Sequence, residues 1–170
     1  MSVTTILRES TLWIKPDQFE AATQALDLMI AKLKDCCLDK PSGTHRHETQ
    51  ADILADRIEQ FGFATVRIYE ETGLVSADSG DGVIFDLLDC MACALAPFTE
   101  SGSYLEFEAR LIYETEFWRY VFDDGQVAIH AGDITFNVPE TFLTQKMALE
   151  QLGLDETVTE LEHTTLEAAA

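Results

Sequence analysis

The stretch YLEFEARLIYETEFWRYVFDDGQVAIHA, residues 104–131, decides the fold. Apolar and polar side chains alternate over Leu105–Ala109, which is the period of a strand with one buried face, and Phe117–Phe122 predicts another strand. Asp123-Asp124-Gly125 is a strong hairpin signal that leads into a third strand, Gln126–Ala131. Because tight turns join antiparallel strands, this segment predicts an antiparallel sheet.

The aromatic side chains of this segment allow two interpretations. Trp118, Tyr120 and Phe122 alternate on one face of their strand, and Arg119 lies on the other. Aromatic side chains on a sheet can stack on nucleic-acid bases, but such a surface also needs positive charge around it. The surrounding sequence is acidic, so we expect these side chains to pack in the core.

Upstream of this segment, the sequence predicts helices between short strands. Phe19, Ala22 and Leu26 recur at helical spacing after Pro16, a residue favoured in the first turn of a helix. The expected elements are a strand over Thr4–Lys15, a helix over 16–35, a polar loop over Leu38–Glu48, a helix over Leu54–Phe61, a hairpin over Ala64–Ala77 and a buried helix over Val83–Ala96.

The order of these elements predicts the fold class. It contains the β-α-β-β-α-β pattern, with one extra helix inserted and extra strands at the end. We therefore expect an α+β fold with a ferredoxin-like antiparallel sheet and helices on one face. Beyond Pro139, apolar spacing predicts a helix to Gly153 and a weaker one over Leu154–Glu167. The expected domains are an α+β sandwich over residues 1–138 and an acidic C-terminal helical extension over residues 139–170.

The charge balance is strongly negative, because 31 Asp and Glu against 11 Lys and Arg give a formal charge of −20. Residues 1–48 carry a net charge of −1 and residues 49–170 carry −19, so the acidity is regional. Such a charge repels phosphate backbones and anionic lipids, which argues against direct binding to nucleic acid or to a membrane. Residues 1–15 contain no long apolar run, so we expect a soluble cytoplasmic protein without signal peptide or membrane span.

Three motifs within residues 94–127 carry a family resemblance. They are the helix end Ala94–Phe98, the strand Gly102–Phe107 and the hairpin Trp118–Gly125. They resemble the A-x-A-P-[YF], G-S-Y-[IL]-E-[FM] and W-R-[WY]-V-F-x-[DN]-G motifs of small, uncharacterised ferredoxin-like proteins of phages, plasmids and their bacterial hosts. The match covers about a fifth of the chain and departs from the pattern at Ala109–Thr115. The resemblance implies the fold and a mobile-element setting, and it assigns no catalytic residue.

Cysteine and histidine residues offer a metal site as one alternative, because zinc is held by thiolates and imidazoles. The candidates are Cys36, Cys37, His45, His47, Cys90 and Cys93. Adjacent cysteines chelate one tetrahedral ion poorly, and the other two fall inside an expected buried helix. That position also argues against a redox dithiol, which needs a helix N-terminus to lower the thiol pKa. We therefore expect reduced thiols, no metal and no cofactor.

Paired carboxylates offer an enzymatic alternative. Glu106 and Glu108 share one face of a strand, and Asp123 and Asp124 lie in the turn nearby, so a divalent-cation or hydrolytic site is conceivable. A carboxylate nuclease would also need a lysine, and Lys146 is the only lysine after residue 40. With 31 carboxylates in the chain such pairs arise by chance, so we expect no catalytic residue.

These observations favour a non-enzymatic binding protein whose acidic C-terminal two thirds engage a basic, nucleic-acid-binding protein. B-DNA carries one negative charge per roughly 1.7 Å of axis, and comparable carboxylate density can occupy a basic groove. The sequence thus predicts a DNA-mimic inhibitor of a host defence complex, of the restriction or CRISPR type. The expected contacts are Glu106, Glu108, Asp123, Asp124, Glu150, Asp155, Glu156, Glu160 and Glu162. The alternatives are a metal-binding or enzymatic protein centred on the cysteines and histidines, and an oligomeric structural protein whose last helix packs on a neighbour.

Overall fold

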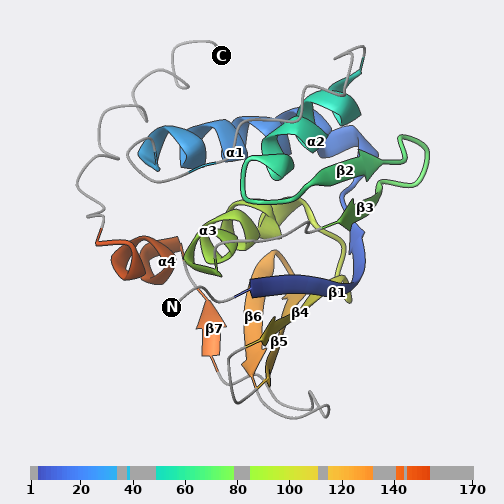
Figure 1. Cartoon of the computed structure of the whole chain (residues 1–170). Coiled ribbons are helices and arrows are strands. Elements are labelled where there is room, and N and C mark those ends of the chain that lie inside the picture. The colour runs from blue at the N-terminus through green and yellow to red at the C-terminus, as the bar shows by residue number, and fades with distance from the viewer. Residues whose placement is uncertain are drawn as a thin grey trace.

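A computed structural model describes residues 4–33, 38, 49–78, 85–110, 115–131, 141–143 and 145–153. Within these residues, seven strands form one open sheet in the order β2-β3-β1-β4-β5-β6-β7, and all neighbouring strands are antiparallel (Figure 1). The strands are β1 (Thr4–Trp13), β2 (Thr65–Ile68), β3 (Leu74–Asp78), β4 (Tyr104–Arg110), β5 (Thr115–Asp123), β6 (Gln126–Ala131) and β7 (Thr141–Leu143).

The helices complete the α+β fold expected from the sequence. They are α1 (Phe19–Lys32), α2 (Gln50–Glu59), α3 (Phe85–Leu95) and α4 (Gln145–Gln151), with short 3-10 turns η1 (Pro16–Gln18) and η2 (Ala96–Phe98). Helix α1 packs against α2 and α3, and α3 also packs against α4. Figure 1 shows α1 and α2 above α3, with β4, β5 and β6 below it. In the described part of the chain, no helix is long and apolar enough to cross a membrane.

Alternation along β4 and β5 creates the core face of the sheet. Phe107 and Trp118 are paired across the two strands and their rings stack, with centroids 6.1 Å apart. Tyr120 meets the Phe107 ring edge-on at 5.9 Å. All three residues, together with Phe122, are buried. Their expected role in the core is confirmed, and they form no surface for stacking bases.

The turn between β5 and β6 follows from two residues with positive φ. Asp124 has φ 46° and Gly125 has φ 73°, and they connect the paired residues Asp123 and Gln126. Positive φ at both central positions is the geometry of a two-residue turn whose twist matches that of antiparallel strands. The hairpin expected from Asp123-Asp124-Gly125 is therefore confirmed.

Helix α2 protects the open edge of the sheet at β2. Its N-terminus has a capping box, in which Thr49 Oγ1 accepts from the Asp52 amide and Asp52 Oδ2 accepts from the Thr49 amide, each at 3.2 Å. Near its C-terminus, the buried Glu59 accepts a hydrogen bond from the Val66 amide at 3.0 Å. The Tyr69 amide donates to the Leu74 carbonyl of β3, and amides point alternately to the two sides of a strand, so the Val66 amide points away from β3. The Glu59 carboxylate therefore occupies a backbone donor that would otherwise attract another strand.

The C-terminal region differs from the sequence expectation. Phe142 and Leu143 belong to β7, which pairs with β6, and the helix begins only at Gln145. A three-residue strand is too short to show alternation, so the sequence did not indicate it. Strand β7 extends the sheet, and α4 packs against α3. The second expected helix, over Leu154–Glu167, lies outside the described residues.

One buried hydrogen bond ties α3 to the core face of the sheet. The Tyr120 hydroxyl donates to Asp89 Oδ1 at 2.5 Å, and both residues are almost fully buried. Burial and the nearby Asp89 carboxylate raise the pKa of Tyr120 well above its ordinary value. The tyrosine therefore keeps its proton and acts as a donor to a carboxylate that water does not reach.

Replacing Tyr120 with phenylalanine should destabilise the protein, because it removes the donor and leaves the ring in place. We expect Tyr120→Phe to lower the free energy of unfolding by about 1–3 kcal/mol, measured by urea denaturation. The matched control is Tyr69→Phe, at an exposed tyrosine of the β2–β3 hairpin, which should change stability by less than about 0.5 kcal/mol. Equal losses in the two variants would contradict this role of the buried hydrogen bond.

Candidate functional site

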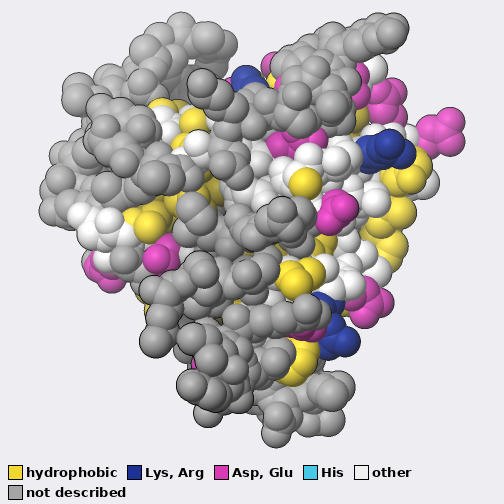
Figure 2. All heavy atoms as spheres, in the orientation of Figure 1, with side chains coloured by type: hydrophobic (Ala, Val, Ile, Leu, Met, Phe, Trp, Pro, Cys, Tyr) yellow, Lys and Arg dark blue, Asp and Glu magenta, His cyan; other side chains and the backbone are white. Residues whose placement is uncertain are grey.

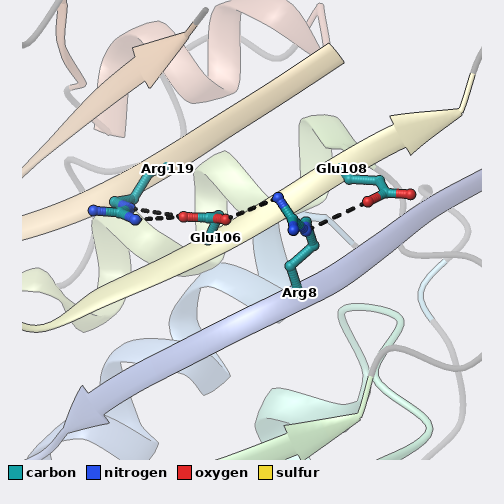
Figure 3. Close-up of polar contacts among 4 residues, drawn as sticks. All are labelled: Arg8, Glu106, Glu108 and Arg119. Atoms are coloured by element: carbon teal, nitrogen blue, oxygen red, sulfur yellow. Dashed lines mark hydrogen bonds and ion pairs between the residues drawn. The ribbon is translucent and has the colours of Figure 1, made fainter. Parts of the chain in front are cut away.

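The sheet has an outer face, opposite to its core face, that carries charged and aromatic side chains. We define it by Tyr104, Glu106 and Glu108 of β4, Phe117 and Arg119 of β5, and Arg8 of β1. On β4 and β5 these residues alternate with core residues, so their side chains lie on the other side of the sheet. Figure 3 shows four of these side chains in front of the strands, with helices behind them.

A chain of ion pairs crosses three strands of this outer face (Figure 3). Glu106 lies directly opposite Arg119 in the register of β4 and β5, and it accepts from Arg119 Nε at 3.1 Å and from Arg119 Nη2. Its other oxygen accepts from Arg8 Nη1 at 3.4 Å. Arg8 Nε also lies 3.4 Å from Glu108 Oε2. Two guanidinium groups thus neutralise two carboxylates.

A β-bulge places Arg8 between the two glutamates. In the pairing of β1 with β4, Leu7 lies opposite Phe107 and Glu9 lies opposite Glu106, so Arg8 is an extra residue on β1. A bulge bends its strand and redirects the side chain of the extra residue. This redirection lets one arginine contact carboxylates on two successive outward positions of β4.

Aromatic rings hold both arginines from a second side. The Arg8 guanidinium lies 5.0 Å from the centroid of the Phe117 ring, and that of Arg119 lies 4.5 Å from the centroid of the Tyr104 ring. Both distances are within the range of cation–π attraction. The arginines are therefore fixed between carboxylates and rings, and the group has no net charge.

The structure pairs Glu106 and Glu108, which were expected to contact a partner, with arginine. Glu106 is only 8% exposed, and both side chains are paired with arginine. Freeing them for a partner would leave Arg8 and Arg119 without these contacts. Both carboxylates therefore contribute to the internal structure of the sheet, and their contact with a partner stays a prediction.

The other expected contacts lie elsewhere. Asp123 and Asp124 are exposed at the β5–β6 turn, and Glu150 is exposed on α4. The remaining four, Asp155, Glu156, Glu160 and Glu162, lie outside the described residues. The structure thus brings Glu106 close to Glu108 and Asp123 next to Asp124, but it does not gather the described residues of the set at one place.

Several carboxylates lie in the interior, which sequence reasoning missed. Asp56 and Glu59 of α2 and Asp89 of α3 are at most 1% exposed. A count of acidic residues treats each of them as a surface charge. The only sequence feature that could have indicated their burial was their position in helices that were expected to pack against the core. Figure 2 shows the acidic side chains at separate places on the visible face, with hydrophobic and uncharged side chains between them.

The cysteines of α3 are poorly suited to nucleophilic chemistry. Cys90 is buried, and burial together with Asp89 and Cys90 raises the pKa of Cys93 to about 12. A thiol with such a pKa stays protonated at neutral pH, whereas the thiolate is the nucleophile and the metal ligand. The other candidates, Cys36, Cys37, His45 and His47, lie outside the described residues. Among the described residues, no group of three or more His, Cys, Asp or Glu could hold a metal ion.

Neutralising Glu106 should destabilise the sheet, because Arg119 and Arg8 would both lose a charged acceptor. We expect Glu106→Gln to lower the free energy of unfolding by about 1–3 kcal/mol, measured by urea denaturation. Glu116→Gln, at an exposed position on β5, should change it by less than about 0.5 kcal/mol. If Glu106→Gln proves as stable as the control variant, the ion pairs do not support the sheet.

The raised pKa of Cys93 predicts a loss of stability in alkali. Its proton is bound more tightly in the folded chain than in the unfolded one, where the pKa is 9.0. This contribution is fully present below pH 9 and is lost as the pH rises from 9 towards about 12. In Cys93→Ala, the free energy of unfolding should therefore decrease less steeply just above pH 9 than in the natural protein. Tyr120 should still lower it above pH 10.0, the ordinary pKa of tyrosine. An unchanged alkaline profile, measured by urea denaturation at stepped pH, would refute this.

Comparison of the chain with protein families, curated proteins and solved structures finds no match.

Proposed function

We propose that this protein is a non-enzymatic binding protein that engages a basic protein partner. The observation that carries the proposal is the formal charge of −20, most of which arises from residues 49–170. Charge of this size produces a field over the surface that steers a cationic partner towards the protein and raises the rate of association.

Internal pairing of the arginines supports the proposal. Arg8 and Arg119 are paired with Glu106 and Glu108, and Arg57 is paired with Asp27. Each such pair contains one positive and one negative charge, so the pairs do not reduce the net negative charge of the chain. The described surface includes exposed carboxylates at Asp123, Asp124 and Glu150.

The narrower form of the proposal is a DNA-mimic inhibitor of a host defence complex. The net charge and the resemblance to proteins of mobile elements support it. Mimicry of a duplex needs rows of uncompensated carboxylates, and the paired Glu106 and Glu108 do not supply them. Its candidate contacts are therefore Asp123, Asp124 and Glu150, together with Asp155, Glu156, Glu160 and Glu162.

A finer description of the fold belongs to the same proposal. The whole sheet has seven strands, whereas the ferredoxin-like pattern has four. Helix α2 has no counterpart in that pattern. We propose that residues 4–110 retain a ferredoxin-like unit. Its support is the local order β2-β3-β1-β4, in which β3 lies between β1 and β2, with α1 before β2 and α3 before β4.

Capture experiments at increasing salt test the proposed function. Immobilised protein incubated with lysate of its native host should retain basic proteins, identified by mass spectrometry. Capture should weaken strongly as ionic strength rises, because the Debye length falls from about 10 Å at 0.1 M to about 3 Å at 1 M. Asp123→Asn/Asp124→Asn, at exposed positions of the β5–β6 turn, should weaken the capture. Recovery of only neutral or acidic proteins, or capture insensitive to salt, would refute the proposal.

A further inference from the structure

We propose that a hollow on the β2–β3 hairpin receives an arginine or lysine side chain of the basic partner. The proposal rests on the proposed function and names the surface on which it would act. Figure 1 shows the loop that joins β2 and β3 projecting at one side of the molecule.

The hollow is open and has a volume of about 460 Å³. It is lined by Tyr69, Glu70, Glu71, Thr72, Leu74 and Ser76. In the region of this hairpin, Figure 2 shows acidic, basic and hydrophobic side chains next to one another. The walls thus combine an aromatic ring, an aliphatic side chain and two carboxylates.

The backbone of the hairpin is held in place by hydrogen bonds, so the residues that line the hollow start from fixed backbone positions. The amides of Thr72 and Gly73 donate to the Tyr69 carbonyl at 3.1 and 2.7 Å, and the Tyr69 amide donates to the Leu74 carbonyl at 3.0 Å. Gly73 has φ +72°, and its carbonyl accepts from the Ile14 amide at 2.9 Å. A Cβ at Gly73 would lie 1.9 Å from the Ile14 carbonyl oxygen, so the turn is packed directly on the end of β1.

Tyr69 presents its ring to solvent at this place. It is 54% exposed, and it is one of the few large apolar side chains that are exposed among the described residues. Tyrosine combines a large apolar face with a polar end, and such residues are enriched at protein interfaces. The outer face of the same sheet already holds Arg119 over the Tyr104 ring at 4.5 Å. A guanidinium or ammonium group over Tyr69 would make the same kind of contact.

The charge of the lining selects a cation. Glu70 and Glu71 are exposed, and no basic residue lines the hollow. Arg67 and Lys15 are exposed nearby, on the strand below the turn and after the end of β1, but they lie outside the lining. A bound cation would therefore sit at the turn, near the two glutamates. An anionic ligand would be repelled there, and a purely apolar ligand would leave the carboxylates unused.

A basic side chain also matches the apolar part of the lining. Arginine and lysine have apolar stems that cover hydrophobic surface while the charged end stays near water. Tyr69 and Leu74 offer that surface, and Glu70 and Glu71 accept hydrogen bonds from the charged end. This division of roles fits one long basic side chain better than a diffuse attraction between charged surfaces.

A rhodamine-labelled oligoarginine peptide, titrated at physiological ionic strength with fluorescence anisotropy as the readout, tests the inference. We expect Tyr69→Ala to weaken binding about two- to five-fold, while Tyr69→Phe binds like the natural protein. We expect Glu70→Gln/Glu71→Gln to weaken binding about three- to ten-fold.

The matched control removes the same charge from exposed positions outside the hairpin. Glu20→Gln/Glu116→Gln, on α1 and β5, should weaken binding less than about two-fold, since it alters only a screened, long-range attraction. In amide NMR spectra, the peptide should shift the signals of Tyr69–Ser76 and leave those of Glu20 and Glu116 in place.

Two other outcomes are distinguishable. Equal weakening by the two charge-removing double variants, with NMR shifts spread over many acidic positions, would overturn the hollow as a site and leave the proposed function standing. If the natural protein does not bind the peptide and captures no basic protein from lysate, the proposed function itself fails and the hollow with it.

Discussion

The register between β4 and β5 determines what both faces of the sheet present. On the core side it pairs Phe107 with Trp118, and on the outer side it pairs Glu106 with Arg119. A shift by one residue would turn the aromatic rings towards solvent and bury the charged groups. The interactions on both faces therefore favour the same register, because the same strand pairing stacks the aromatic rings and brings the charged side chains together. The hydrogen bond from Tyr120 to Asp89 then fixes α3 over the core face.

Sequence patterns predicted the parts of the fold that depend on alternation and on turn chemistry. The two-residue period of β4 and the hairpin at Asp124-Gly125 could be recognised because each depends on neighbouring residues alone. The ion pair between Glu106 and Arg119 depends on how β4 and β5 align, and the sequence between them, Leu111–Glu114, contains no Gly, Pro, Asn, Asp or Ser to predict a turn. The bulge that directs Arg8 onto both glutamates leaves no local signal either. Strand β7 has three residues, too few for a period to appear.

The acidic composition has a more varied origin than a count suggests. Glu59 stabilises the edge of the sheet by accepting a hydrogen bond from the Val66 amide, and Asp89 stabilises the core by accepting a hydrogen bond from the Tyr120 hydroxyl. Glu106 serves the outer face through two arginines. These carboxylates are explained by structure alone. The sequence could not separate them from surface carboxylates, because burial is decided by contacts between distant segments rather than by residue type.

The neutral group on the outer face limits what charge alone can do for this protein. Because Arg8 and Arg119 compensate Glu106 and Glu108, these two carboxylates add no net charge at the centre of the sheet, and the negative surplus comes from other carboxylates. A dispersed field speeds encounter but does not fix orientation, since each contribution is weak and screened. Orientation needs a recess with apolar walls beside the charge. The β2–β3 turn, packed on the end of β1 and carrying Tyr69 beside Glu70 and Glu71, supplies that combination.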